Sequence, residues 1–290
     1  MVLWAANFIV VKAAITVLPP IGFAFIRFGL ASLTLLALLR WREGSIGLPR
    51  RDIVPIAFLG ALGFGVYQSL WASALTTISP GDSALIIAAT PVLTALLAVV
   101  AGSDVLTAGK LVGALVSFAG VAIVIGADRL NLGASLVGDL LTLGAAACFA
   151  VYTAFGAPVL VRHSALRMTT WAIVFGTLFL AIPGLLELAT MDLSRVGPGP
   201  LGGVLYSAFL SAGVSNVVVF HAVWLLGPTR VTAFQFLVPG FAVVLAALFL
   251  GDPIRLAQVV GGAIIVLGVV VTRAGSHWPG SRRPGVFSAR

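Results

Sequence analysis

The chain of 290 residues is 60% hydrophobic and only 9% charged, and its formal net charge is +8. A water-soluble domain would carry about a quarter charged residues, so the composition indicates a polytopic, all-α membrane protein. The basic balance does not point to nucleic acid, because the basic residues gather in short links and in the tail, as cytoplasmic loops require. The single cysteine, Cys148, excludes an intramolecular disulfide and a paired-cysteine metal site.

Turn-forming and charged residues divide the chain into ten apolar segments of membrane-spanning length. Proline marks tight links between neighbours at Pro19-Pro20, Pro80, Pro228 and Pro253, where it begins the next helix without losing a hydrogen bond. The predicted spans are 2–17, 20–40, 53–76, 82–101, 105–126, 137–160, 167–188, 200–225, 229–250 and 254–273.

The charges of the links predict the orientation of the chain. With the N-terminus in the cytoplasm, twelve lysines and arginines fall in inside links and the tail, and three fall outside. We therefore expect both termini to be cytoplasmic in a cell membrane of the bacterial inner-membrane type. The basic tail that follows Arg273 could also contact anionic lipid.

Several residues recur 148 positions later without a gap, which indicates an internal repeat. Because each copy has five spans, an odd number, the second copy is predicted to be inverted in the membrane. We expect a first repeat over 1–126, an external linker over 127–137, a second repeat over 138–273 and a cytoplasmic tail over 274–290. Two inverted five-helix repeats around a central cavity are typical of a transporter. The matched pairs are Gly65/Gly213, Gln68/Asn216, Ala74/Ala222, Pro80/Pro228, Pro91/Pro239, Asp104/Asp252, Gly113/Gly261 and Gly120/Gly268.

Lys12 and Arg27 are the ionised side chains that lie well inside predicted spans. A charge in the bilayer is costly unless it faces protein or water, so both are expected to point into the bundle. They form either a cationic patch for a substrate carboxylate or structural pairs with Asp82, with Asp139 or with helix C-terminal carbonyls.

The amides Gln68 and Asn216 occupy equivalent places in the two copies, near the predicted midplane. Polar and aromatic neighbours accompany them, which favours a cavity wall, although such groups can also bond between helices. The expected substrate-contacting residues beside this pair are Tyr67, Trp71, Tyr152, Ser215 and Gln235.

Two further pairs of symmetry mates predict structural features. Pro91 and Pro239 fall in mid-span, where each removes one helical hydrogen bond, so they are expected to act as hinges or to shape the cavity, with a static bend as the alternative. The glycine pairs Gly113/Gly120 and Gly261/Gly268 predict close packing of the fifth and tenth spans, or a dimer face. Both a monomer and a homodimer remain open.

The pattern resembles the EamA-type drug/metabolite transporters, which have ten helices in two inverted repeats. The resemblance implies a small-molecule substrate and adds Asn7 to the expected substrate contacts. Within the family the chain resembles bacterial amino-acid and metabolite exporters, including the YddG type that exports aromatic amino acids. The residues on which the resemblance rests are Trp4, Asn7, Lys12, Arg27-Phe28, the run Pro80–Ala84, Pro91, Asp104, Gly113, Gly138-Asp139-Leu140 and the run Pro228–Gly268.

The leading hypothesis is export of small organic solutes, with amino acids or related metabolites as substrates. The alternatives are a drug or nucleotide-sugar carrier and a membrane scaffold or receptor that does not transport. An intramembrane hydrolase is disfavoured, because no acidic residue lies in mid-span and no nucleophile with a base lies at depth. No phosphate-binding loop or metal motif is present in the sequence, so we expect neither a cofactor nor an enzyme.

Overall fold

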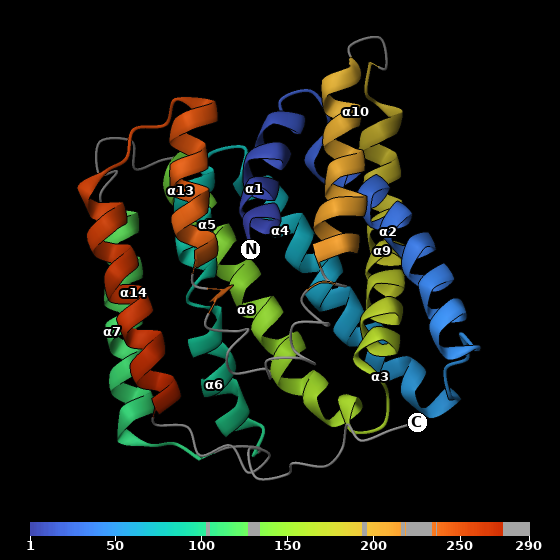
Figure 1. The fold of residues 1–290 in the computed structure, drawn as a ribbon, viewed down its shortest axis with the longest axis horizontal. Helices are drawn as coiled ribbons and strands as arrows, with labels where there is room; N and C mark the ends of the chain where they lie inside the picture. The colour runs from blue at the N-terminus through green and yellow to red at the C-terminus, as the bar shows by residue number, and fades with distance from the viewer. Residues whose placement is uncertain are drawn as a thin grey trace.

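The computed structural model describes residues 1–102, 105–126, 134–192, 196–215, 218, 234–235 and 237–274. Within these ranges every regular element is a helix (Figure 1). The elements are α1 (Val2–Ala14), α2 (Pro20–Glu43), α3 (Arg50–Gly60), η1 (Ala61–Val66), α4 (Tyr67–Ala74), α5 (Pro80–Ile87), α6 (Thr90–Val100), α7 (Ala108–Gly126), α8 (Ala134–Leu160), α9 (Ala165–Ala189), α10 (Pro198–Leu205), η4 (Tyr206–Val214), α13 (Leu237–Leu250) and α14 (Leu256–Ala274).

The described helices have the length and surface of membrane spans. Seven are long and apolar enough to cross a bilayer, and α1 and α13 are shorter apolar helices. With the helix formed by α10 and η4, the described residues contain ten apolar helical stretches, as the sequence predicts. Large side chains such as Leu33, Leu186 and Leu248 are more than 60% exposed, which suits contact with lipid. The predicted all-α polytopic membrane fold is confirmed.

Local sequence signals set where these helices begin and end. Proline occupies the first turn of α2, α5 and α10, where its missing N–H costs nothing. The hydroxyls of Ser79 and Ser164 accept hydrogen bonds from backbone N–H groups of α5 and α9, and so cap both helices. Gly44 ends α2 with a φ of 69°, in the left-handed region that favours glycine.

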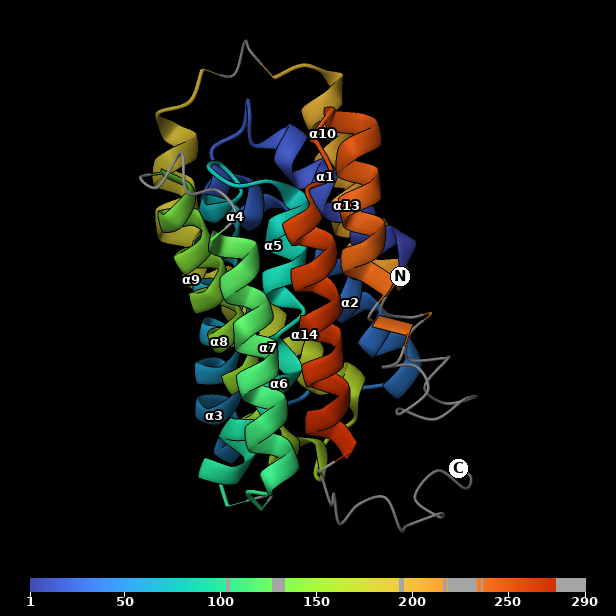
Figure 2. The ribbon, with the colours of Figure 1, turned by 90° about the vertical axis from the view of Figure 1, so that its left-hand side faces the viewer.

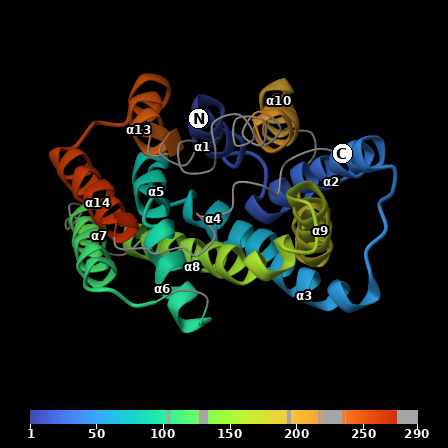
Figure 3. The same cartoon turned by 60° about the horizontal axis from the view of Figure 1, so that its bottom comes forward.

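Consecutive spans run in opposite directions between two ends of the bundle (Figures 1 and 2). We call these the Pro20 end, where α2, α5, α10 and α14 begin, and the Arg50 end, where α3, α7 and α9 begin. Figure 3 shows the α7–α14 pair at one side of the bundle and α2, α3 and α9 at the other.

Two spans depart from the regular helices that the sequence predicts. The third is continuous from Arg50 to Ala74 but contains the π-helix η1, and the eighth contains the π-helix η4. A shift of η1 by 148 residues gives 209–214, which lies inside η4. The fourth span, predicted as 82–101 with a hydrogen bond lost at Pro91, breaks between Ile87 and Thr90 into α5 and α6. Pro91 in the first turn of α6 accounts for the break, because it cannot donate a helical hydrogen bond.

Helices α7 and α14 pack closely through glycine. A Cβ placed on Gly113 would lie 2.5 Å from the backbone oxygen of Gly268, and one on Gly120 would lie 2.7 Å from that of Gly261. Real Cβ atoms do not approach other atoms so closely, so hydrogen at these positions lets the two backbones touch. The predicted close packing of the fifth and tenth spans is confirmed.

Candidate functional site

Arg27 of α2 lies at the centre of a buried polar cluster. Its side chain is buried, and its Nη1 donates to Ser207 Oγ of η4 at 2.7 Å. Its Nη2 donates to Gln68 Oε1 of α4 at 3.1 Å, and Ser207 Oγ donates in turn to Asn7 Oδ1 of α1. We call Asn7, Arg27, Gln68, Trp71 and Ser207 the Arg27 cluster. It joins three helices of the predicted first half to one element of the second.

Aromatic rings enclose the guanidinium of Arg27. Its Cζ lies 4.5 Å from the ring centroid of Phe28, 5.6 Å from that of Trp71 and 5.9 Å from that of Phe23. Such rings attract a cation through their negative faces. Trp71 also meets Phe8 of α1 edge to face, with the ring centroids 5.2 Å apart. The guanidinium therefore lies among aromatic rings of α2 and α4, and α1 supports one of these rings.

The cluster is incompletely satisfied. Among the described residues, Arg27 Nε and Trp71 Nε1 have no hydrogen-bond partner, although both atoms are buried. No carboxylate of the described residues pairs with Arg27. Buried polar groups without partners are rare in folded proteins and call for a physical explanation. The arrangement has spare donor capacity and a net positive charge, so chemically it can receive an acceptor group.

The predicted residues Tyr67 and Tyr152 lie in a neighbouring aromatic cluster. The Tyr67 and Phe149 ring centroids are 5.3 Å apart, and Tyr152 lies 5.6 Å from Phe149 and 5.1 Å from Phe64. These rings come from η1, α4 and α8. Tyr67 precedes Gln68 directly in α4, so this aromatic cluster adjoins the Arg27 cluster along that helix and connects it to α8.

Lys12 points elsewhere. Its ammonium donates to the backbone oxygens of Leu75, at 2.5 Å, and Ile78, at 3.0 Å, which follow the last residue of α4. These contacts match the structural alternative of pairing with helix C-terminal carbonyls. The structure therefore does not bring Lys12 and Arg27 into one cationic patch.

The remaining predicted residues are distributed as follows. Ser215 donates to the backbone oxygen of Leu210, which satisfies it locally. Gln235 is half-buried, and Asn216 lies outside the described residues. Pro91 is half-buried near the start of α6, and Pro239 is buried near the start of α13.

Ser207 is a member of the cluster that the sequence analysis did not select. It is fully buried, and it links Asn7 to Arg27. Ser207, Ser211 and Ser215 recur at intervals of four residues, and Ser215 is one of the substrate-contacting residues that the sequence predicts. That spacing was the signal that could have identified it.

A separate cavity of about 280 Å³ opens at the Pro20 end rather than at Arg27. Asp82, Asp139 and Asp252 line it together with Arg255 and Gln258. Asp82 accepts hydrogen bonds from Arg255 and, at 3.0 Å, from Gln258 Nε2. The pairing of Asp82 with Arg255 connects α5 to the start of α14 and so joins the two predicted halves at this end.

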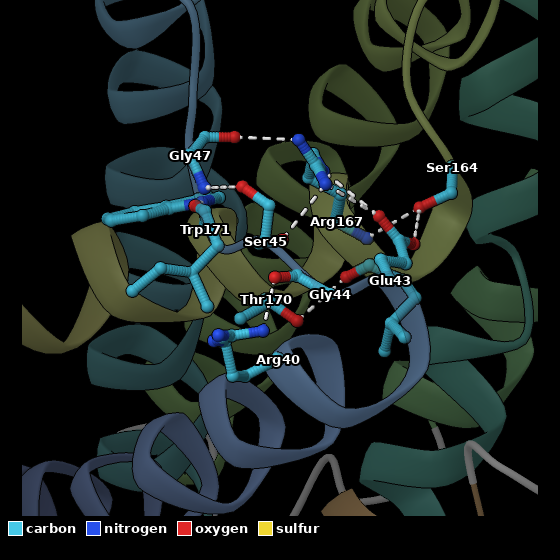
Figure 4. A network of polar contacts seen from close by, with 11 residues as sticks. Arg40, Glu43, Gly44, Ser45, Gly47, Ser164, Arg167, Thr170 and Trp171 are labelled. Atoms are coloured by element: carbon cyan, nitrogen blue, oxygen red, sulfur yellow. Dashed lines mark hydrogen bonds and ion pairs between the residues drawn. The ribbon is translucent and has the colours of Figure 1, made fainter.

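At the Arg50 end, a polar network fixes the link between α2 and α3 against α9 (Figure 4). Arg167 of α9 donates to Glu43 Oε2 at 3.0 Å and to the backbone oxygens of Ser45 and Gly47 at 3.0 and 2.7 Å. Trp171 Nε1 donates to the backbone oxygen of Ile46 at 2.9 Å. All these acceptors lie between residues 43 and 47, so α9 holds the whole turn in place.

A second ion-pair group lies at the same end. Asp52 of α3 is buried, and its two carboxylate oxygens contact Arg162 at 2.7 Å and His163 at 2.8 Å. Both partners lie in the turn between α8 and α9. The first and second predicted halves are thus joined by charge at both ends of the bundle.

The fold and these contacts define a polytopic helical membrane protein with a buried polar site between its helices. The model of the EamA-like transporter family matches residues 1–126 and 136–274, so the chain belongs to that family and is a transporter rather than an enzyme.

Individual proteins agree with this assignment. The chain is 29% identical over 279 residues to an "Uncharacterized transporter" of Archaeoglobus fulgidus, covering 96% of both chains. It is also 29% identical to a "Probable terminal-alkyne amino-acid exporter" of Streptantibioticus cattleyicolor, covering 93% of this chain and 89% of that one. A crystal structure with 19% sequence identity has the same fold, with a TM-score of 0.65 over 94% of this chain and 93% of that chain.

Proposed function

We propose that the protein exports small organic solutes from the cytoplasm by alternating access, and that the Arg27 cluster is its substrate site. The proposed substrates are amino acids, including aromatic ones, or related metabolites. The observation that carries this proposal is the position of the cluster. Its hydrogen bonds join α1, α2 and α4 to η4, so it lies where the two predicted halves meet. Transporters built from two repeats bind substrate at that interface.

The helix contacts support the inverted repeat that alternating access requires. Helix α1 packs on α13, and α8 packs on α6. The two pairs correspond, because the residues 148 positions after α1 lie mostly in α8 and those 148 positions before α13 lie mostly in α6. In the same way the packing of α2 on η4 corresponds to that of α9 on η1. We propose that 1–126 and 138–273 are the two copies, and that some of their helices bend about the Arg27 cluster during alternating access.

The substrate class rests on the relatives and on the chemistry of the site. The Streptantibioticus relative is named as an amino-acid exporter. The cluster offers amide, hydroxyl and guanidinium groups beside aromatic rings, which suits a small polar solute with an apolar part. A nucleotide sugar carries more negative charge than one buried arginine would balance, since Lys12 is engaged by backbone carbonyls.

Transport assays in liposomes test this function. Purified protein is reconstituted, the vesicles are loaded with single amino acids, and exchange with labelled amino acid is measured against empty vesicles. We expect exchange for a subset of amino acids and a roughly tenfold loss in Ser207→Ala, because that change removes a hydrogen bond to the charged Arg27. Ser83→Ala is the matched control, since Ser83 is equally buried in α5 but has no partner among the described residues. Exchange that is absent for every amino acid, or that is equal in the two variants, would contradict the proposal.

A further inference from the structure

The free donors of Arg27 lie on one edge of its guanidinium. In arginine, Nε and Nη2 carry parallel N–H bonds that match the two oxygens of a carboxylate. Nη2 donates to Gln68 Oε1, whereas Nε has no partner among the described residues. An amide oxygen therefore contacts one of the two nitrogens that a side-on carboxylate would use, and the other nitrogen has no partner among the described residues.

Trp71, whose ring lies near the guanidinium, supplies a second unpartnered donor. Trp71 is 3% exposed and Arg27 is 5% exposed, and the guanidinium carbon lies 5.6 Å from the Trp71 ring centroid. An indole nitrogen can only donate, so its needs are met only by an acceptor. Two buried donors of this kind, close together, point to an acceptor-rich group that binds between them.

The charge balance points in the same direction. Arg27 lies two turns into α2, and no described carboxylate compensates its charge. A lone charge within a membrane span is costly, and a bound anion would remove that cost. A single arginine balances one negative charge, which matches a monocarboxylate better than a phosphate dianion.

We propose that the carboxylate group of the substrate binds side-on to Arg27. One oxygen accepts from Nη2 in place of Gln68 Oε1, the second accepts from Nε, and Trp71 Nε1–H donates to the same group. Gln68 is then a placeholder that holds Arg27 in position while the site is empty. This inference rests on the proposed function, and it names the substrate chemistry as a carboxylate with an apolar part against Phe23 and Phe28.

The first experiment places a carboxylate permanently in the site. Gln68→Glu replaces the amide oxygen that contacts Nη2 with a charged oxygen on the same side chain. We expect a higher melting temperature of the unliganded protein in detergent, because Arg27 gains a counter-charge, and at least a roughly tenfold weaker affinity for carboxylates. An unchanged or lower melting temperature combined with undiminished carboxylate affinity would overturn the proposal.

The second experiment compares ligands that differ in one group. Phenylacetate and phenylacetamide, and isovalerate and isovaleramide, are titrated into purified wild-type protein by calorimetry. We expect each acid to bind at least about tenfold more tightly than its amide, since only the acid forms charge-assisted hydrogen bonds with Arg27. Equal affinity, or no binding of either member of both pairs, would overturn the carboxylate site.

Variants then assign the preference to the named atoms. Trp71→Phe keeps the ring and removes the free N–H, and Arg27→Lys keeps the charge and removes the two-donor edge. Each should reduce the ratio of acid affinity to amide affinity by at least about fivefold. Trp171→Phe is the control, because that indole N–H already donates to Ile46, and it should keep the ratio. A ratio unchanged in Trp71→Phe and in Arg27→Lys would show that another site recognises the acid.

The two proposals fail in different ways. A neutral amide that liposomes transport as fast as its acid would overturn the carboxylate site and leave the transporter function intact. Acid-selective binding in detergent without exchange of any amino acid in liposomes would retain the carboxylate site and remove amino-acid export.

Discussion

Ser117 of α7 donates its hydroxyl to the backbone oxygen of Ile265 of α14, 3.1 Å away, and the two residues stand 148 positions apart. The helices themselves, 108–126 and 256–274, are offset by the same interval. A residue touches its own repeat mate only close to a two-fold axis that relates the copies. The glycine contacts agree, since the mates of Gly113 and Gly268 are Gly261 and Gly120, which form the other close pair. These contacts support the proposed inverted repeat.

This close contact predicts a strong effect of one methyl group. Gly113→Ala would place Cβ against the backbone of α14, which cannot give way as a side-chain end can. We expect a loss of about 1–3 kcal/mol in the free energy of unfolding, measured by denaturation in detergent. Gly126→Ala is the control at the end of the same helix, where a Cβ meets nothing within 4 Å. Equal stability of the two variants would contradict the contact.

The N-terminus of α2 predicts a second stability effect. Glu187 Oε2 accepts from the backbone N–H groups of Ile21 and Gly22 at 2.8 and 2.9 Å, where a negative charge also suits the helix dipole. We expect Glu187→Ala to lower the free energy of unfolding by about 0.5–2 kcal/mol, the usual range for loss of a cap. Glu187→Gln keeps an acceptor oxygen and should lose less. The prediction fails if the alanine variant is no less stable than the glutamine variant.

The matched prolines predict effects on transport rate. Pro91 follows the break between α5 and α6, where Thr90 Oγ1 donates to the free backbone oxygen of Ile87 at 2.6 Å. Alanine restores a helical donor and favours one continuous helix, so we expect Pro91→Ala and Pro239→Ala to slow turnover more than they weaken binding. Inverted copies should shift the carrier in opposite directions, and labelling of Tyr67→Cys from each side of the membrane reports that shift. Wild-type turnover with unchanged labelling in both variants would mean that neither proline acts as a hinge.

The charge distribution predicts which end of the bundle faces the cytoplasm. We expect Arg51→Cys, at the Arg50 end, to react with an impermeant thiol reagent only from inside, and Gly197→Cys, before α10, only from outside. Both variants are made in a Cys148→Ser background, because Cys148 is the cysteine of the natural sequence. Labelling of the two positions from the same side would contradict the alternation of the helices, and reversed labelling would contradict the orientation.

The sequence was most informative where one residue decides a local structure. Proline predicted the starts of α2 and α5, and the cost of a buried charge predicted that Arg27 faces the interior. The sequence could not decide whether Lys12 binds a substrate carboxylate or pairs with groups of the protein, because a backbone carbonyl acceptor at the end of another helix leaves no trace in the sequence. The π-helix η1 was missed as well, since its backbone pattern depends on tertiary packing, which places Gly63 against Tyr152.

The glutamates at the ends of α2 and α9 have a mechanical consequence. Glu43, at the last residue of α2, binds Ser164 and Arg167 at the start of α9, and Glu187 near the end of α9 binds the start of α2. Two antiparallel helices that are bonded to each other at both ends cannot slide along or roll over each other without breaking the contacts at one end. The α2–α9 pair therefore behaves as one rigid unit. Bending of the bundle is concentrated instead in spans with interrupted backbone hydrogen bonding, such as the one divided between α5 and α6.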